Sequence, residues 1–193
     1  MIRRYLNLIL ILFLSVLSFG QYTKIGNGGF ASGNFGPLRT DTSSSYFSRF
    51  AFIYPSSTLT NLKHGDSISA LSFFYESFDS IRGNCNMKVF LKSTSQADFG
   101  ATALNWSAES RTMVPIYDDN PKKLIGSIPQ EILLKLSKPY AWDTTGGMIH
   151  LEILVEYTQK VNQVGTMNWS VESSFYVPGF VSQRPNVQVC VHT

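Results

Sequence analysis

Apolar and polar residues alternate with a period of two along much of this chain. In residues 148–157, Ile149, Leu151, Ile153 and Val155 fall on one face of an extended segment, and polar residues fall mainly on the other. Successive side chains of a β-strand point to opposite sides of a sheet, so this pattern predicts a strand with one buried face. No segment sustains the 3.6-residue period of a helix. We therefore expect an all-β protein.

The same alternation predicts about nine strands. They cover residues 22–25, 46–54, 68–75, 85–92, 113–117, 131–136, 148–157, 167–177 and 186–192. Turns rich in Gly, Asn and Asp separate these segments. Residues 130–136 could instead form two helical turns after Pro129, but Pro139 and the surrounding β pattern favour a strand. Many short strands separated by turns predict an antiparallel β-sandwich of jelly-roll type.

Residues 1–20 have the layout of a secretory signal peptide. A positively charged start is followed by an almost wholly apolar run over residues 6–17, and small residues precede a predicted cleavage site between Gly20 and Gln21. The apolar run is shorter than the roughly 18–20 residues of a membrane-spanning helix, which argues against an uncleaved anchor. We expect residues 21–193 to be one secreted domain, extracellular or on the cell surface, with no stable membrane span after cleavage.

Charge and composition narrow the range of partners. The chain has a formal charge of +3, and removing the two arginines of the leader leaves +1. No run of Lys or Arg remains that could follow a phosphate backbone, so nucleic acid is not an expected partner. Aromatic residues make up 13% of the chain and charged residues 15%, a balance that suits strands.

Two cysteines, Cys85 and Cys190, could form a disulfide in an exported protein. Cys85 shares a strand face with Met87 and Val89, which predicts that it points into the core. Cys190 alternates with Val189 and Val191, so it lies on the face of its strand that is opposite to these two apolar residues. The two sulfur atoms are then expected to point in different directions, which argues against the bridge but leaves both alternatives open.

A set of strand and turn motifs extends over most of the mature chain. It includes Tyr46-Phe47-Ser48-Arg49, Gly65-Asp66-Ser67-Ile68, Met87-Lys88-Val89-Phe90-Leu91, Val114-Pro115-Ile116-Tyr117 and Lys138-Pro139-Tyr140-Ala141-Trp142. From about residue 46 to 157 the chain resembles the β-sandwich modules of secreted Bacteroidota surface proteins, which often precede a type IX secretion sorting domain. The resemblance implies an adhesive, accessory or structural role. No sorting domain follows in this sequence, and we expect a subunit of a surface assembly.

Titratable residues give little indication of catalysis. The three histidines, His64, His150 and His192, show no metal-ligand or catalytic spacing, so an enzyme is not expected. Glu152 and Glu156 lie four residues apart on one predicted strand, which separates their backbones by about 13 Å. We interpret them as two charges on a solvated sheet face rather than as a glycosidase pair.

Two further segments are candidate binding sites. Asp118, Asp119 and Asn120 place hard oxygen ligands in one turn, which could hold calcium, and no other cofactor is expected. Tyr140 and Trp142 lie beside a Gly-rich turn and could stack on sugar rings.

The leading hypothesis is a non-catalytic secreted or cell-surface module with an adhesive or structural role. Its partner would be an extracellular glycan or a surface protein. The alternative is a carbohydrate-binding module accessory to a secreted enzyme.

Overall fold

The strands of this protein assemble into two main antiparallel sheets. The computed structural model describes residues 21–25, 30–32, 38, 47–78, 84–100, 104–126, 130–159, 167–172, 176–177, 180–181, 184–185 and 187–192. In this part of the chain every strand pairing is antiparallel. Helical structure there is confined to α2 (Trp106–Arg111) and three 3-10 turns. The prediction of an all-β protein is confirmed.

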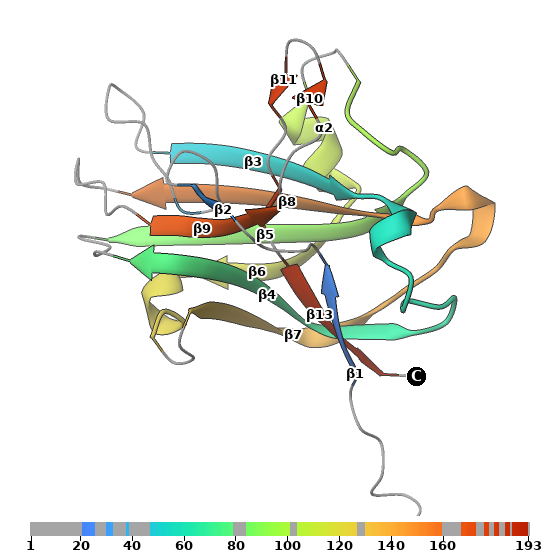
Figure 1. Ribbon diagram of the computed structural model, residues 1–193, viewed down its shortest axis with the longest axis horizontal. Helices are drawn as coiled ribbons and strands as arrows, with labels where there is room; N and C mark the ends of the chain where they lie inside the picture. The colour runs from blue at the N-terminus through green and yellow to red at the C-terminus, as the bar shows by residue number, and fades with distance from the viewer. Residues whose placement is uncertain are drawn as a thin grey trace, which may run out of the picture.

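The described strands differ widely in length. They are β1 (Gln21–Ile25), β2 (Phe30–Ser32), β3 (Phe47–Tyr54), β4 (Ser67–Phe78), β5 (Cys85–Thr94), β6 (Val114–Asp119), β7 (Glu131–Ala141), β8 (His150–Gln159), β9 (Met167–Glu172), β10 (Tyr176–Val177), β11 (Phe180–Val181), β12 (Arg184–Pro185) and β13 (Val187–His192). The 3-10 turns are η1 (Ser56–Thr58), η2 (Pro121–Lys123) and η3 (Thr145–Gly147). The long strands β3 to β8 run roughly along the longest axis of the molecule (Figure 1).

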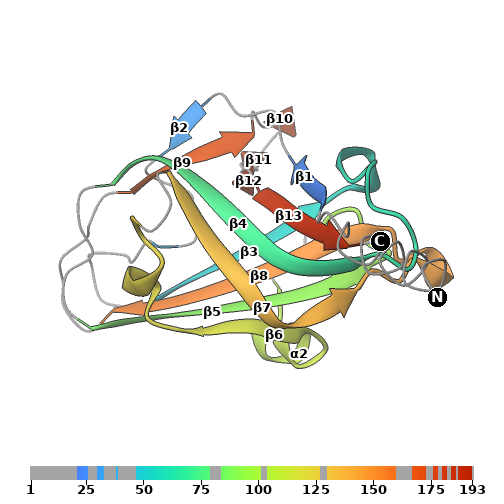
Figure 2. The same ribbon diagram turned by 90° about the horizontal axis from the view of Figure 1, so that it is seen from below.

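A four-stranded sheet has the strand order β3-β8-β5-β6. Its inner strand β8 pairs without a register shift with β3 and with β5, so Glu152 lies opposite Ile53 on one side and Lys92 on the other. The second sheet has seven strands and is built around β4, which pairs with β13, β7 and β9. In Figure 2 α2 lies below the four-stranded sheet, on the side away from β4 and β13.

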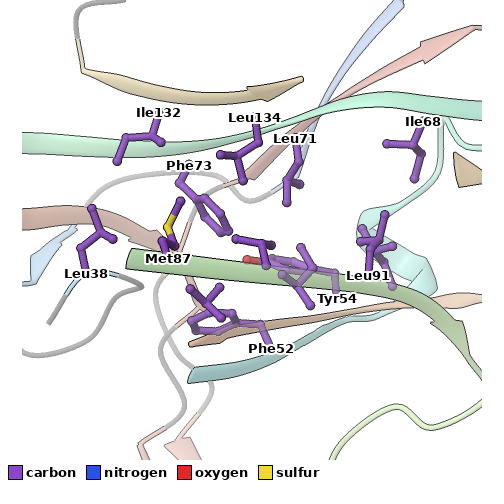
Figure 3. Packing of buried hydrophobic residues seen from close by; sticks show 14 of the residues in the cluster. Leu38, Phe52, Tyr54, Ile68, Leu71, Phe73, Met87, Leu91, Ile132 and Leu134 are labelled. Atoms are coloured by element: carbon purple, nitrogen blue, oxygen red, sulfur yellow. The ribbon is translucent and has the colours of Figure 1, made fainter. Parts of the chain in front are cut away.

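The core joins residues of both sheets in one apolar cluster. From the four-stranded sheet it takes Phe52, Tyr54, Cys85, Met87, Val89, Leu91, Leu151, Ile153, Val155 and Tyr157. From the seven-stranded sheet it takes Ile68, Leu71, Phe73, Tyr75, Ile132, Leu134 and Val191. Figure 3 shows residues of the two sets facing one another, with Phe73 above Met87 and Tyr54. In β3, β5 and β8 the alternating pattern of the sequence therefore marks the side of the strand that enters this core.

Each predicted strand overlaps a strand of the structure. Residues 131–136 belong to β7 and are not helical, so the preference for a strand there is confirmed. The count of nine is not confirmed, because the described residues contain thirteen strand segments, several with only two or three residues. The predicted strand 167–177 is divided between β9 and β10. Helix α2 is not among the predicted elements.

Residues 1–20, the predicted signal peptide, lie outside the described residues, and Gln21 is the first residue of β1. Among the described residues there is no helix with the length and apolar character needed to cross a membrane.

Candidate functional site

The two aromatic residues predicted to bind sugars have structural contacts. Trp142 is only 2% exposed and belongs to the core cluster, so its ring offers no face to a ligand. Tyr140 is half-buried against the same cluster. Its hydroxyl accepts a hydrogen bond from the backbone N–H of Ser93 at 2.7 Å and lies 3.0 Å from Ser93 Oγ. Both rings therefore help to fix the end of β7, and Trp142 in particular does not fit the stacking role predicted for it.

The predicted calcium ligands are engaged by groups of the protein. Asp118 Oδ1 accepts from Asn86 Nδ2 at 2.8 Å. Asp119 Oδ2 accepts from Lys123 Nζ at 2.6 Å, and this hydrogen bond lowers the pKa of the Asp119 carboxyl. Asn120 Oδ1 caps η2 through the N–H of Lys122. No group of three or more His, Cys, Asp or Glu residues able to hold a metal occurs in the described part of the chain.

Both cysteines are free thiols, and they lie in different sheets. Cys85 is buried, as predicted, and its thiol donates to Asn120 Oδ1 at 3.1 Å. Burial raises the pKa of the Cys85 thiol, which favours the unreactive protonated form. Cys190 is partly exposed, and its neighbour Val191 on β13 belongs to the core. Cys85 therefore lies on the core face of its strand and Cys190 on the face away from the core, as the alternation predicted.

Two connections at one end of the molecule form a surface that we call the tip. It consists of residues 55–66, between β3 and β4, and residues 142–149, between β7 and β8, at the right-hand end of Figure 1. The backbones of Gly65 and Trp142 are hydrogen-bonded at 3.0 Å, and those of Trp142 and Asp66 at 2.7 Å. Gly65 has φ +89°, a conformation that side chains disfavour. The tip is therefore two loops fixed to each other.

Exposed side chains of two chemical kinds gather at the tip. His64 and Asp143 form a polar pair, with Nδ1 of the histidine 3.5 Å from the carboxylate and each side chain about 60% exposed. In the same loop as Asp143 are Met148 and Ile149, exposed by 44% and 41%. They are two of the three large apolar residues exposed in the described part of the structure, the third being Val114. Large exposed apolar side chains next to polar groups are typical of contact surfaces.

The outer face of the four-stranded sheet is covered around Glu152 and Leu154, contrary to our interpretation from the sequence. Glu152 and Leu154 alternate with the core residues of β8, so they face away from the core, yet they are 1% and 0% exposed. Ile53 on β3 and Met113 after α2 are also buried outside the core cluster. The interpretation of Glu152 as a charge on a solvated face is therefore wrong. Its partner in that interpretation, Glu156, keeps 21% side-chain exposure.

Three charged residues, which we call the Lys92 cluster, meet on this face. Lys92 extends from β5, Glu109 from α2 and Glu152 from β8. The Lys92 ammonium contacts Glu109 Oε1 directly and lies 3.2 Å from Glu152 Oε2. It also lies 3.4 Å from Thr112 Oγ1. One cation thus joins the helix to the centre of the sheet.

Glu152 is the unusual member of the cluster. Despite the ion pair with Lys92, neither of its carboxylate oxygens accepts a well-aligned hydrogen bond from the described residues. Burial raises the pKa of the Glu152 carboxyl, and the Lys92 ammonium offsets only part of this effect. An incompletely satisfied carboxylate in a covered face is costly for the fold. Buried polar groups without full hydrogen bonding are often functional residues, so Glu152 is a candidate for a functional role.

Sequence reasoning did not find the Lys92 cluster because its three members lie far apart in the chain. The alternation predicts strands at Lys92 and Glu152 but not the register of β5 and β8, which sets the two residues opposite each other. One available signal was Asn105, whose side chain caps α2 by accepting from the N–H of Ala108 at 3.1 Å.

Comparison of the chain with models of protein families, with curated proteins and with solved structures found no match. The resemblance to secreted Bacteroidota modules stays a prediction.

Proposed function

We propose that this chain is a non-catalytic secreted or cell-surface module, folded as a jelly-roll-like β-sandwich, that has an adhesive or structural role. Two antiparallel sheets that share one apolar core support the sandwich. The leader-like residues 1–20 support export. Extracellular sandwich modules make their contacts largely through loops at the ends of the sheets.

The tip is the observation that carries this proposal. Its two loops are fixed to each other by backbone hydrogen bonds, so its exposed groups have a set geometry before any partner arrives. Met148 and Ile149 supply apolar contact area, and the neighbouring His64–Asp143 pair supplies polar contacts. We propose a surface protein of the producing cell as the partner, because an apolar centre with a polar rim is the usual composition of protein interfaces.

Binding of the processed chain to cell envelopes tests the role of the tip. The wild-type chain is incubated with envelope fragments from cells that lack its gene, and the bound fraction is measured after sedimentation. We expect saturable binding, and a loss of at least about tenfold in affinity for Met148→Ser/Ile149→Ser. The control is Val114→Ser, which removes an apolar side chain of similar exposure outside the tip and should bind like wild type.

Equal binding of wild type and the double variant would exclude the tip as the contact surface. Protease treatment of intact producing cells separately tests the proposal that the chain is exported. We expect the chain to be degraded from outside, with its leader removed. A protected cytosolic chain that retains residues 1–20 would overturn the proposed location.

A further inference from the structure

We propose that the Lys92 cluster is a self-modification site, at which the Lys92 amine and the Glu109 carboxyl condense to an amide bond and Glu152 transfers the protons. This modification would be a single event on the chain itself and would turn over no external substrate. It does not rest on the proposed adhesive role, because it concerns the outer face of the four-stranded sheet and not the tip.

The first requirement is contact between the reacting groups, and the fold supplies it. Lys92 Nζ touches the Glu109 carboxylate although the two residues come from different elements, β5 and α2. The side chains keep only 21% and 25% of their exposure, so bulk water reaches them partly. Holding two reactants in contact can replace a very high concentration of free reactant, which favours a condensation that is unfavourable between separate molecules in water.

The second requirement is a group that moves protons, and Glu152 is placed to do so. Its Oε2 lies 3.2 Å from the Lys92 nitrogen on the side provided by β8. Ile53 lies opposite Glu152 on β3, on the side away from Lys92, and Leu154 follows on the same face of β8; both side chains are buried and apolar. Burial also raises the pKa of this carboxyl, so that it holds a proton more readily than an exposed glutamate does.

The reaction balances without a co-reactant. A proton passes from the Lys92 ammonium to the Glu109 carboxylate, which leaves a neutral amine facing a carboxylic acid. The nitrogen lone pair attacks Cδ of Glu109 and forms the C–N bond. Glu152 takes a proton from the nitrogen and delivers it to the departing hydroxyl, so the C–O bond breaks and one water molecule leaves. Glu152 ends in its starting state.

The product would also relieve the electrostatic cost of the cluster. The amide replaces one ammonium and one carboxylate, so two partly buried charges disappear. Without the Lys92 ammonium beside it, the buried Glu152 carboxylate takes up a proton from solvent and can then donate to the new amide oxygen, which gives a partner to a carboxyl group that has no aligned hydrogen bond in the ion-paired state. Helix α2 becomes covalently attached to β5.

Mass spectrometry of the processed full chain tests this proposal directly. Trypsin cleaves after Lys88, Lys92 and Arg111 in an unmodified chain and releases peptides 89–92 and 93–111. An amide at Lys92 blocks the middle cleavage. We therefore expect one peptide, 89–111, that is lighter than its sequence by the mass of one water molecule, with fragmentation that localises the link to Lys92 and Glu109.

Variants and an internal control make the test specific. Lys92→Arg and Glu109→Ala should each abolish the mass loss, and Glu152→Gln should abolish or strongly slow it while the circular dichroism spectrum stays that of wild type. Lys88 is the internal control, since it lies 3.5 Å from Asp118 at an exposed position and should remain cleavable.

Two results would overturn the proposal. Recovery of wild-type peptides 89–92 and 93–111 at their sequence masses would show that Lys92 and Glu109 form an ion pair only. Complete cross-linking in folded Glu152→Gln would exclude the proton-transfer role of Glu152.

Discussion

In the middle of strand β8 both faces are buried, but they are buried in different ways. The inner face carries Leu151, Ile153 and Val155, which belong to the apolar core between the sheets. The outer face carries Glu152 and Leu154, which lie outside that core and are nevertheless 1% and 0% exposed. Alternation along a strand thus identifies the face that meets the opposite sheet. It does not show whether the other face meets water.

The outer face differs from the core in its chemistry as well. Its cover includes charged side chains, and Lys92 connects Glu109 of α2 to Glu152 of the sheet. A core of apolar side chains needs no partner of matched charge, whereas a buried carboxylate does. We infer that the inner face mainly stabilises the fold, while the outer face is a covered site with a specific arrangement of charges.

The largest effect is expected for a substitution that tests whether water is excluded from the outer face as completely as from the inner face. Leu154→Ala should lower the free energy of unfolding by about 2–5 kcal/mol, in the same range as Ile153→Ala on the inner face, because each leaves a cavity at a fully buried position. Urea denaturation of the two variants beside wild type measures both changes. A loss below about 0.5 kcal/mol for Leu154→Ala alone would mean that the outer face is solvated.

The next effect concerns the pH dependence that Glu152 gives to stability. Burial raises the pKa of its carboxyl in the folded state above the ordinary value of 4.5, so the folded protein binds this proton more tightly than the unfolded chain. Stability from this group is therefore greatest below the ordinary pKa and is lost as pH rises through the higher, folded-state pKa. Glu152→Gln cannot ionise and should avoid this loss.

Urea midpoints of wild type and Glu152→Gln over a series of pH values measure this difference. The variant should gain stability relative to wild type as pH increases from about 4.5 toward neutrality, by about 1–3 kcal/mol in total, the usual cost of an unsatisfied buried group. Parallel curves for the two proteins would contradict the buried, ionisable state of Glu152.

Much of the fold could be predicted from the sequence because its strands have regular patterns. Residues 85–92 and 148–157 alternate clearly, and both belong to long strands of the structure. The two cysteines could be assigned to different faces by the same rule. Short strands such as β10 and β11 contain two residues each, which is too few to display a period.

The site could not be predicted, because burial of an outer face depends on tertiary contacts. In the alternating pattern of β8, Glu152 falls on the polar face, which is expected to be solvated. It is buried because α2 and the residues next to it cover this part of the sheet. The stacking role predicted for Trp142 does not fit the structure for the same reason. Its neighbours in sequence, Asp143 and the Gly-rich turn, are exposed, but the ring itself enters the core.

A smaller effect is expected at the beginning of α2. Asn105→Ala removes the side chain that accepts from the N–H of Ala108 and should cost about 1 kcal/mol, the usual value of a helix cap. Ser107→Ala, at an exposed position of the same helix, is the matched control and should stay within about 0.5 kcal/mol of wild type. Thermal unfolding measures both. An equal effect of the two substitutions would show that the cap does not hold the cover of the outer face.

The smallest effect is expected at Arg49, which lies at the edge of the covered part of the outer face and contacts both β8 and α2. Its Nε donates to Glu156 Oε2 at 2.8 Å, and its guanidinium carbon lies 5.2 Å from the centre of the Trp106 ring. Because Arg49 keeps 45% exposure, water and salt screen the pair, and Arg49→Lys should cost only about 0.5 kcal/mol. Most of that loss should come from the planar stacking on Trp106, which a lysine reproduces poorly.

A double-mutant cycle of Arg49→Lys with Trp106→Leu, measured in low and high salt, separates the contribution of the Trp106 ring from that of the ion pair with Glu156. A coupling energy near zero at both salt concentrations, with a loss for Arg49→Lys that disappears in high salt, would assign the effect to the ion pair with Glu156 instead.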